Sequence, residues 1–152
     1  SLDQALAQAR LAGVSRFMGI SVDLDDHIKL AEIASRHDDV GYSVGVHPCE
    51  DDHIMARATT DYLVELAQSE KVWALGETGL DYYHSTDFIA EQKQCFARHI
   101  QASKIVKKPV VGLQSGFVQS VCGKTRAQHR DQIRHWPTIG SQSGRLPVHC
   151  CG

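Results

Sequence analysis

A regular alternation of helical and strand patterns over the first 111 residues is the feature that most restricts the fold. Apolar residues recur at helical spacing near residues 2–9, 25–37, 62–67 and 88–100. In the second of these helices, the spacing predicts that Ile28, Ala31 and Ile33 or Ala34 face inward. Short apolar segments typical of buried strands stand between and after them, at residues 14–20, 40–46, 72–76 and 109–111. Strands reached through helices predict right-handed crossovers and a parallel sheet. Four such strands fit half of an eight-stranded (β/α) barrel or a small doubly wound sheet, and periodicity does not distinguish the two.

The pattern changes near Val111, where we place a boundary. Residues 1–111 carry 11 Lys and Arg against 17 Asp and Glu, whereas residues 112–152 carry 5 against 1. Apolar residues beyond the boundary keep no sustained period. We therefore expect a parallel α/β unit over residues 1–111 and an irregular tail over residues 112–152. We hypothesise that the tail is translated in a shifted reading frame, which the nucleotide sequence would decide.

Charge, cysteine content and hydropathy argue against several classes of protein. The formal charge of −2 lacks the basic excess of a typical nucleic-acid binder, although a bound metal can supply positive charge. The five cysteines are odd in number and include no C-x-x-C pair, which argues against a disulfide framework or a zinc ribbon. No apolar run approaches the roughly 20 residues of a membrane span, and no signal-peptide pattern is seen. We expect a cytoplasmic protein that does not enter a membrane.

Glu77 is the first candidate for chemistry. It stands in the sequence Ala-Leu-Gly-Glu-Thr-Gly-Leu-Asp-Tyr-Tyr (74–83), directly after the expected strand 72–76. Active sites of α/β folds lie at the C-terminal ends of the strands, and Gly76 and Gly79 leave room for a sharp turn or a ligand. A carboxylate here can bridge two cations. It can equally cap the next element or pair with a nearby base.

His47 is the second candidate, because it follows the expected strand 40–46 and would share an edge of the sheet with Glu77. A neutral imidazole can bind a metal or donate a hydrogen bond to a phosphate oxygen. The alternative is a structural hydrogen bond. We interpret His84 as a solvated side chain and His99, on the inward face of the fourth helix, as a packing residue.

These motifs resemble the TatD family of metal-dependent hydrolases. Gly-Val-His-Pro (45–48), followed by Gly-Glu-Thr-Gly-Leu-Asp (76–81), carries the likeness, which extends over about residues 2–111. The family resemblance implies a (β/α) TIM-type barrel with a two-metal site that cleaves phosphodiester bonds in DNA, often from the 3′ end. It implies that Glu77 is the bridging metal ligand and that His47 lies near the metals as a catalytic or substrate-binding residue. The metal is expected to be magnesium or a transition ion.

The sequence also departs from the family pattern. The family has an H-x-H pair on its first strand, and this chain begins at the expected first helix. A V-H-[ST]-R motif is expected after Val111, whereas Gly-Leu-Gln-Ser-Gly (112–116) stands there. With the resemblance limited to this region, we expect a fragment, a partial TatD-like (β/α) barrel over residues 1–111, with impaired catalysis. Two alternatives stay open: an inactive remnant, or a half-barrel interaction module that self-associates through exposed sheet edges.

Overall fold

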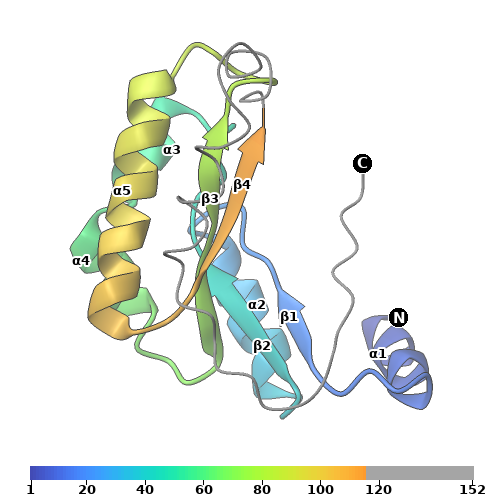
Figure 1. Cartoon of the computed structure of the whole chain (residues 1–152). Coiled ribbons are helices and arrows are strands. Elements are labelled where there is room, and N and C mark those ends of the chain that lie inside the picture. The colour runs from blue at the N-terminus through green and yellow to red at the C-terminus, as the bar shows by residue number, and fades with distance from the viewer. Residues whose placement is uncertain (116–152) are drawn as a thin grey trace, which may run out of the picture. The chain divides into compact units, whose positions relative to one another are not determined.

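The computed structural model describes residues 1–115, which form a four-stranded parallel sheet with helices between the strands (Figure 1). The elements follow one another in the order α1 (Leu2–Leu11), β1 (Phe17–Gly19), α2 (Asp26–Ser35), β2 (Val40–Val44), α3 (Asp52–Arg57), α4 (Thr60–Leu66), β3 (Val72–Asp81), α5 (Ile89–Val106) and β4 (Val110–Ser115). The spatial order β1-β2-β3-β4 repeats the order in the sequence. Successive right-handed crossovers in one direction place the connecting helices on one face of the sheet. The predicted half-barrel is therefore confirmed, and the doubly wound alternative is wrong.

Sequence-local features set the ends of α1. Ser1 and Gln4 form a reciprocal capping box at its N-terminus. At the other end, Gly13 adopts a φ of +94°, a conformation that residues with a Cβ rarely take. Arg10 then attaches this helix to the loop before β2, through bonds of 2.6 and 2.7 Å to the Asp39 carboxylate.

The core lies between the sheet and the helices. All five residues of β2 are buried, as expected for an inner parallel strand. α5 covers β3 with its buried residues Gln92, Cys95, His99 and Ala102. In α2, Ala34 is buried and Ala31 and Ile33 are partly buried, as predicted. Ile28 is 66% exposed, so its predicted inward position is wrong; Leu24, in the turn before the helix, is fully buried instead.

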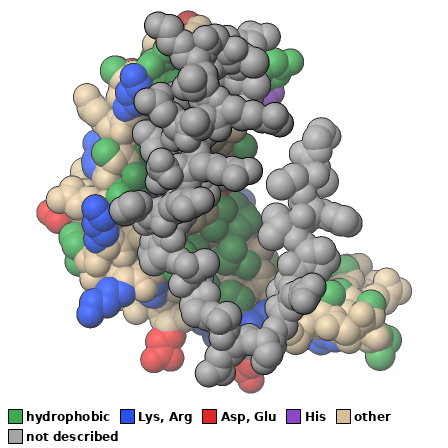
Figure 2. Space-filling view, viewed as in Figure 1, with side chains coloured by type: hydrophobic (Ala, Val, Ile, Leu, Met, Phe, Trp, Pro, Cys, Tyr) green, Lys and Arg blue, Asp and Glu red, His purple; other side chains and the backbone are tan. Residues whose placement is uncertain are grey.

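At β1, unlike β2, one face of the sheet carries exposed side chains. Phe17 and Gly19 are partly buried, and a Cβ on Gly19 would meet Leu30 of α2. Met18 and Ile20, which point to the opposite face, are 40% and 38% exposed. Figure 2 shows hydrophobic side chains in the middle of this view and charged ones toward its left and lower edges. Exposed apolar residues on a sheet face are typical of a barrel wall seen from inside.

Two elements differ from the predictions. α3 was not expected, because its six residues are too few to show helical periodicity. β4 continues to Ser115, four residues past the predicted boundary, because Gly112 to Ser115 pair in parallel with Thr78 to Asp81. The rest of the predicted irregular tail, with its proposed frameshift, lies outside the described residues. Within residues 1–115, no helix has the length and hydropathy needed to cross a membrane.

Candidate active site

Ser21 connects the C-terminal ends of the first two strands. Its side chain and backbone are fully buried just after β1. The Ser21 N–H donates to the Ser43 hydroxyl at 3.1 Å, and the Ser21 hydroxyl lies 3.2 Å from the Gly45 carbonyl oxygen. It also donates to the Asp23 carbonyl oxygen at 2.5 Å. These bonds hold the segment after β1 against the end of β2.

The same segment receives both residues that the sequence singled out. The Glu77 N–H donates to the Ser21 carbonyl oxygen at 2.8 Å, and the His47 N–H donates to the Val22 carbonyl oxygen at 2.8 Å. Two successive carbonyl groups therefore bring Glu77 and His47 to one place at the end of the sheet. Their roles toward metal and phosphate stay predictions.

Glu77 lies inside β3, whereas the sequence predicted it directly after a strand. β3 runs five residues beyond Gly76. Its pairing with β2 ends at Val44–Leu75, but its pairing with β4 continues through a one-residue bulge to Asp81. Glu77 is thus beyond the end of β2 although its own strand continues. A pattern of buried residues on one strand does not reveal which neighbours the strand keeps.

The backbone at Gly76 brings β3 close to β4. Gly76 has a φ of +129°, and a Cβ there would collide with the Val111 carbonyl group. The peptide bond between Gly76 and Glu77 is cis. The Glu77 side chain is partly buried, and within residues 1–115 no hydrogen bond or ion pair reaches its carboxylate. It is therefore available as a ligand in this part of the chain.

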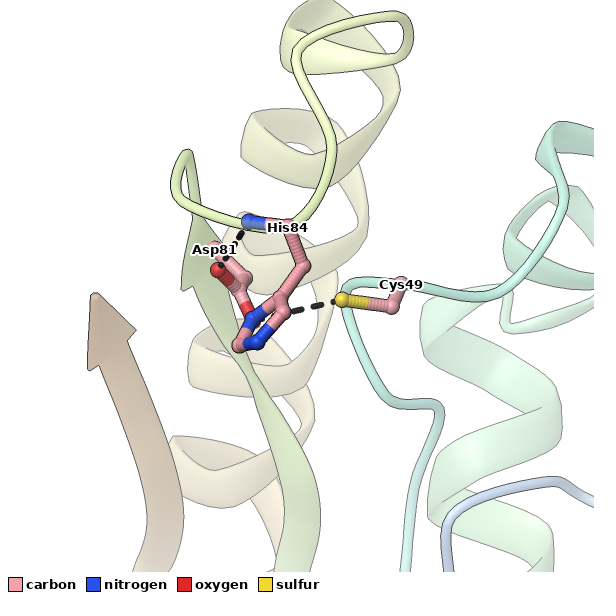
Figure 3. Close-up of side chains that lie close together, drawn as sticks. All are labelled: Cys49, Asp81 and His84. Atoms are coloured by element: carbon pink, nitrogen blue, oxygen red, sulfur yellow. Dashed lines mark hydrogen bonds and ion pairs between the residues drawn. The ribbon is translucent and has the colours of Figure 1, made fainter. Parts of the chain in front are cut away.

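Asp81, at the end of β3, has a different environment. One carboxylate oxygen accepts from the N–H groups of Tyr83 and His84, each at 3.1 Å, and from the Ser115 hydroxyl. The other oxygen lies 2.8 Å from His84 Nδ1 and 3.2 Å from the Cys49 thiol sulfur (Figure 3). Although burial opposes its charge, the hydrogen bonds from Ser115, His84 and Cys49 hold the pKa of Asp81 below its ordinary value.

Sequence reasoning missed this second cluster. It interpreted His84 as a solvated residue, and the His84 side chain is indeed 65% exposed, but it contacts the buried carboxylate of Asp81. The spacing Asp-x-x-His within a turn after a strand was a usable sign. No sequence pattern pointed to Cys49, because only the fold brings it close to residues 81–84.

His99 supports the loop that carries His47. It is fully buried; its Nδ1 bonds to the Cys95 carbonyl oxygen at 2.8 Å, and its Nε2 accepts from the Val46 N–H at 3.2 Å. Burial lowers the pKa of His99 to about 4, so the ring is neutral at pH 7. The interpretation of His99 as a packing residue is confirmed.

Residues 1–112 match the family model described as TatD related DNase. The chain belongs to the TatD family of metal-dependent hydrolases. A relative in Escherichia coli K12, the metal-dependent hydrolase YcfH, is 33% identical over 110 residues, covering 72% of this chain and 40% of YcfH. The 3′-5′ ssDNA/RNA exonuclease TatD of Cronobacter sakazakii is 31% identical over 112 residues, covering 71% of this chain and 41% of that enzyme.

The fold of the TatD-like part agrees with a solved structure. The crystal structure of YJJV, a TatD homologue from E. coli K12, superposes with a TM-score of 0.60 at 20% identity. The alignment covers 71% of this chain and 42% of YJJV. The chain spans about 40% of the length of the curated relatives it matches.

Proposed function

We propose that this TatD chain contributes Glu77 and His47 to a metal-dependent site that hydrolyses phosphodiester bonds in DNA, removing nucleotides from the 3′ end. The observation that carries the proposal is the attachment of both residues to successive carbonyl groups, at Ser21 and Val22. The names of the curated relatives, a metal-dependent hydrolase and a 3′-5′ ssDNA/RNA exonuclease, support the chemistry.

The residues present fit part of such a site. The Glu77 carboxylate offers two oxygen ligands with no competing hydrogen bond from residues 1–115, which suits a bridge between two cations. A catalytic metal usually takes about three protein ligands, and no set of three that includes Glu77 is found in the described part of the chain. Two bound cations would supply a nucleophilic water and neutralise charge on the phosphate.

His47 is suited to hold substrate. Its Nδ1 accepts a hydrogen bond from the Cys49 N–H at 3.1 Å, which leaves Nε2 as the N–H donor of the neutral ring. That N–H can donate to a phosphate oxygen or to a water beside it. The role we assign to His47 is therefore positioning of the phosphodiester.

A hybrid enzyme tests the proposal. Residues 2–111 of this chain replace the aligned segment of the C. sakazakii exonuclease, which keeps the rest of its own barrel. We expect metal-dependent release of nucleotides from single-stranded DNA, which Glu77→Gln abolishes and Glu70→Gln, at an exposed position before β3, leaves intact. A folded hybrid that is inactive, or activity that survives Glu77→Gln, would contradict the proposal.

Self-association is a second candidate, favoured by the exposed apolar residues at β1. β1 and β4 are the outer strands of the sheet formed by residues 1–115, and Met18 and Ile20 are exposed on one face. Unpaired strand edges and apolar faces promote pairing with another chain. Light scattering of the full chain tests this: a monomer at all concentrations contradicts it, and a dimer that Met18→Lys dissociates supports it. A cytoplasmic location stays a prediction.

A further inference from the structure

Three potential metal ligands from two distant segments meet beside β3. Cys49 lies in the loop after β2, whereas Asp81 and His84 lie at the end of β3 and in the following turn (Figure 3). One ligand atom from each, the Cys49 sulfur, an Asp81 oxygen and a His84 nitrogen, lies within 4.8 Å of the other two. Glu77 is not part of this group.

We propose that Cys49, Asp81 and His84 bind one zinc-like divalent cation, at a site separate from the one assigned to Glu77. In a tetrahedral zinc site, the bond lengths to sulfur, nitrogen and oxygen place ligand atoms about 3.4–3.6 Å apart. Here the Asp81 oxygen is 3.2 Å from the Cys49 sulfur and 2.8 Å from His84 Nδ1. On binding, the two Asp81 distances would lengthen by a few tenths of an ångström, and the Cys49 sulfur and His84 nitrogen, which lie within 4.8 Å of each other, would take a separation of about 3.6 Å.

The chemistry of the ligands selects the kind of cation. Thiolate and imidazole prefer zinc and related transition ions, whereas magnesium and calcium prefer oxygen ligands. Three protein ligands leave a fourth position for water. The His84 side chain is 65% exposed and Cys49 is also exposed, so solvent and an entering ion can reach the cluster.

The surrounding residues fix the central ligand before any cation arrives. Asp81 is buried, and its second oxygen is held by the N–H groups of Tyr83 and His84. The Gln92 amide holds the Asp81 backbone on both sides, accepting from its N–H at 2.9 Å and donating to its carbonyl oxygen at 3.3 Å. Ligands oriented by such bonds lose little freedom when they bind a metal.

Binding requires a defined movement of protons. The Cys49 thiol, which donates to Asp81, must lose its proton to solvent, and the His84 ring must carry its proton on Nε2 so that Nδ1 can bind. Affinity for the cation should therefore rise with pH.

The bound cation would cross-link the loop after β2 to the turn after β3. Cys49 is two residues from His47, and its N–H already bonds to the His47 ring. A metal that holds Cys49 would restrict this loop, and binding to the folded state alone would raise stability by mass action. The expected effect is a structural one, measurable without any assay of catalysis.

Cobalt titration of the full chain tests the proposal, with Cys122, Cys150 and Cys151 changed to Ser so that only Cys49 and Cys95 supply thiols. We expect one Co²⁺ per chain, with a thiolate-to-cobalt charge-transfer band and the absorption of a tetrahedral ion. Cys49→Ser should abolish the charge-transfer band. His84→Gln should weaken binding at least about tenfold, and zinc should raise the midpoint of thermal unfolding only when all three ligands are present.

Matched controls separate this site from other sites. His53→Gln alters another exposed histidine beside an acidic residue and should leave the affinity unchanged. Glu77→Gln should also leave the cobalt band unchanged, whatever it does to nuclease activity. Absence of the charge-transfer band, its survival in Cys49→Ser, or equal weakening by His53→Gln or Glu77→Gln would overturn the proposal.

Discussion

The Glu77 N–H is bonded at 2.8 Å to the carbonyl oxygen of Ser21, a residue that follows a different strand. Ser21 in turn bonds to Ser43 and to the Gly45 carbonyl group, at the end of β2. The position of the candidate metal ligand therefore depends on three strands of the sheet at once. A substitution of the Ser21 side chain should therefore also alter the position of Glu77.

Ser21→Ala should lower the free energy of unfolding by about 1–3 kcal/mol, because it removes the hydroxyl that donates to the Asp23 carbonyl oxygen and lies 3.2 Å from the Gly45 carbonyl oxygen. In the hybrid enzyme the substitution should also reduce nucleotide release. Without the Ser21 hydroxyl, the segment whose carbonyl group holds Glu77 is less firmly attached to the end of β2. Urea unfolding and the nuclease assay measure the two effects. Ser35→Ala, at an exposed hydroxyl that bonds to the Glu32 carbonyl group, is the control and should change stability by less than about 0.5 kcal/mol. Equal effects of the two substitutions would refute the role of Ser21.

Gly79→Ala should destabilise the protein by at least about 3 kcal/mol. Gly79 has a φ of +137°, and a Cβ there would collide with the Leu113 carbonyl group of β4. Gly112→Ala is the matched control, because a Cβ at that position meets nothing within 4 Å. We expect it to change stability by less than about 1 kcal/mol. The close approach of β3 and β4 is disproved if both variants unfold at the same urea concentration.

Stability should fall as pH is lowered from about 6.5 toward 4. Burial lowers the pKa of His99 to about 4 from its ordinary value of 6.5, so the folded state binds fewer protons than the unfolded state between these values. The His99 contribution is fully present above the higher value and declines below it, by up to roughly 3 kcal/mol.

Urea unfolding as a function of pH measures this contribution. His99→Gln should flatten the dependence between pH 6.5 and 4, the range set by the two pKa values of His99. His53→Gln, at an exposed position, should leave it as in the unsubstituted chain. An unchanged slope in His99→Gln would mean that another group titrates.

Leu24→Ala should cost about 2–5 kcal/mol, because Leu24 is fully buried in the core and its truncation leaves a cavity. Ile28→Ala should stay within about 0.5 kcal/mol, because the Ile28 side chain is 66% exposed. Urea unfolding of both variants compares the core residue that the structure reveals with the one that periodicity predicted. A larger loss of unfolding free energy in Ile28→Ala than in Leu24→Ala would support the sequence-based prediction that Ile28 faces the core.

The sequence by itself determined the kind of fold and the candidate carboxylate. Alternating helix and strand patterns are local, and parallel strands joined by right-handed crossovers follow from them. The motif around Glu77 is also local, so its residues and the family could be recognised without coordinates. His99 could be placed in the core because helical spacing shows which face is buried.

Only the tertiary structure decided how far each strand extends and which side chains from distant segments lie together beside it. The extension of β3 to Asp81 depends on pairing with β4, which exists only when both strands are in place. The meeting of Cys49 with Asp81 and His84 depends on the path of the loop after β2. Hydrogen bonds and contacts between distant segments leave no periodic trace in a sequence, because each partner is compatible with many local structures.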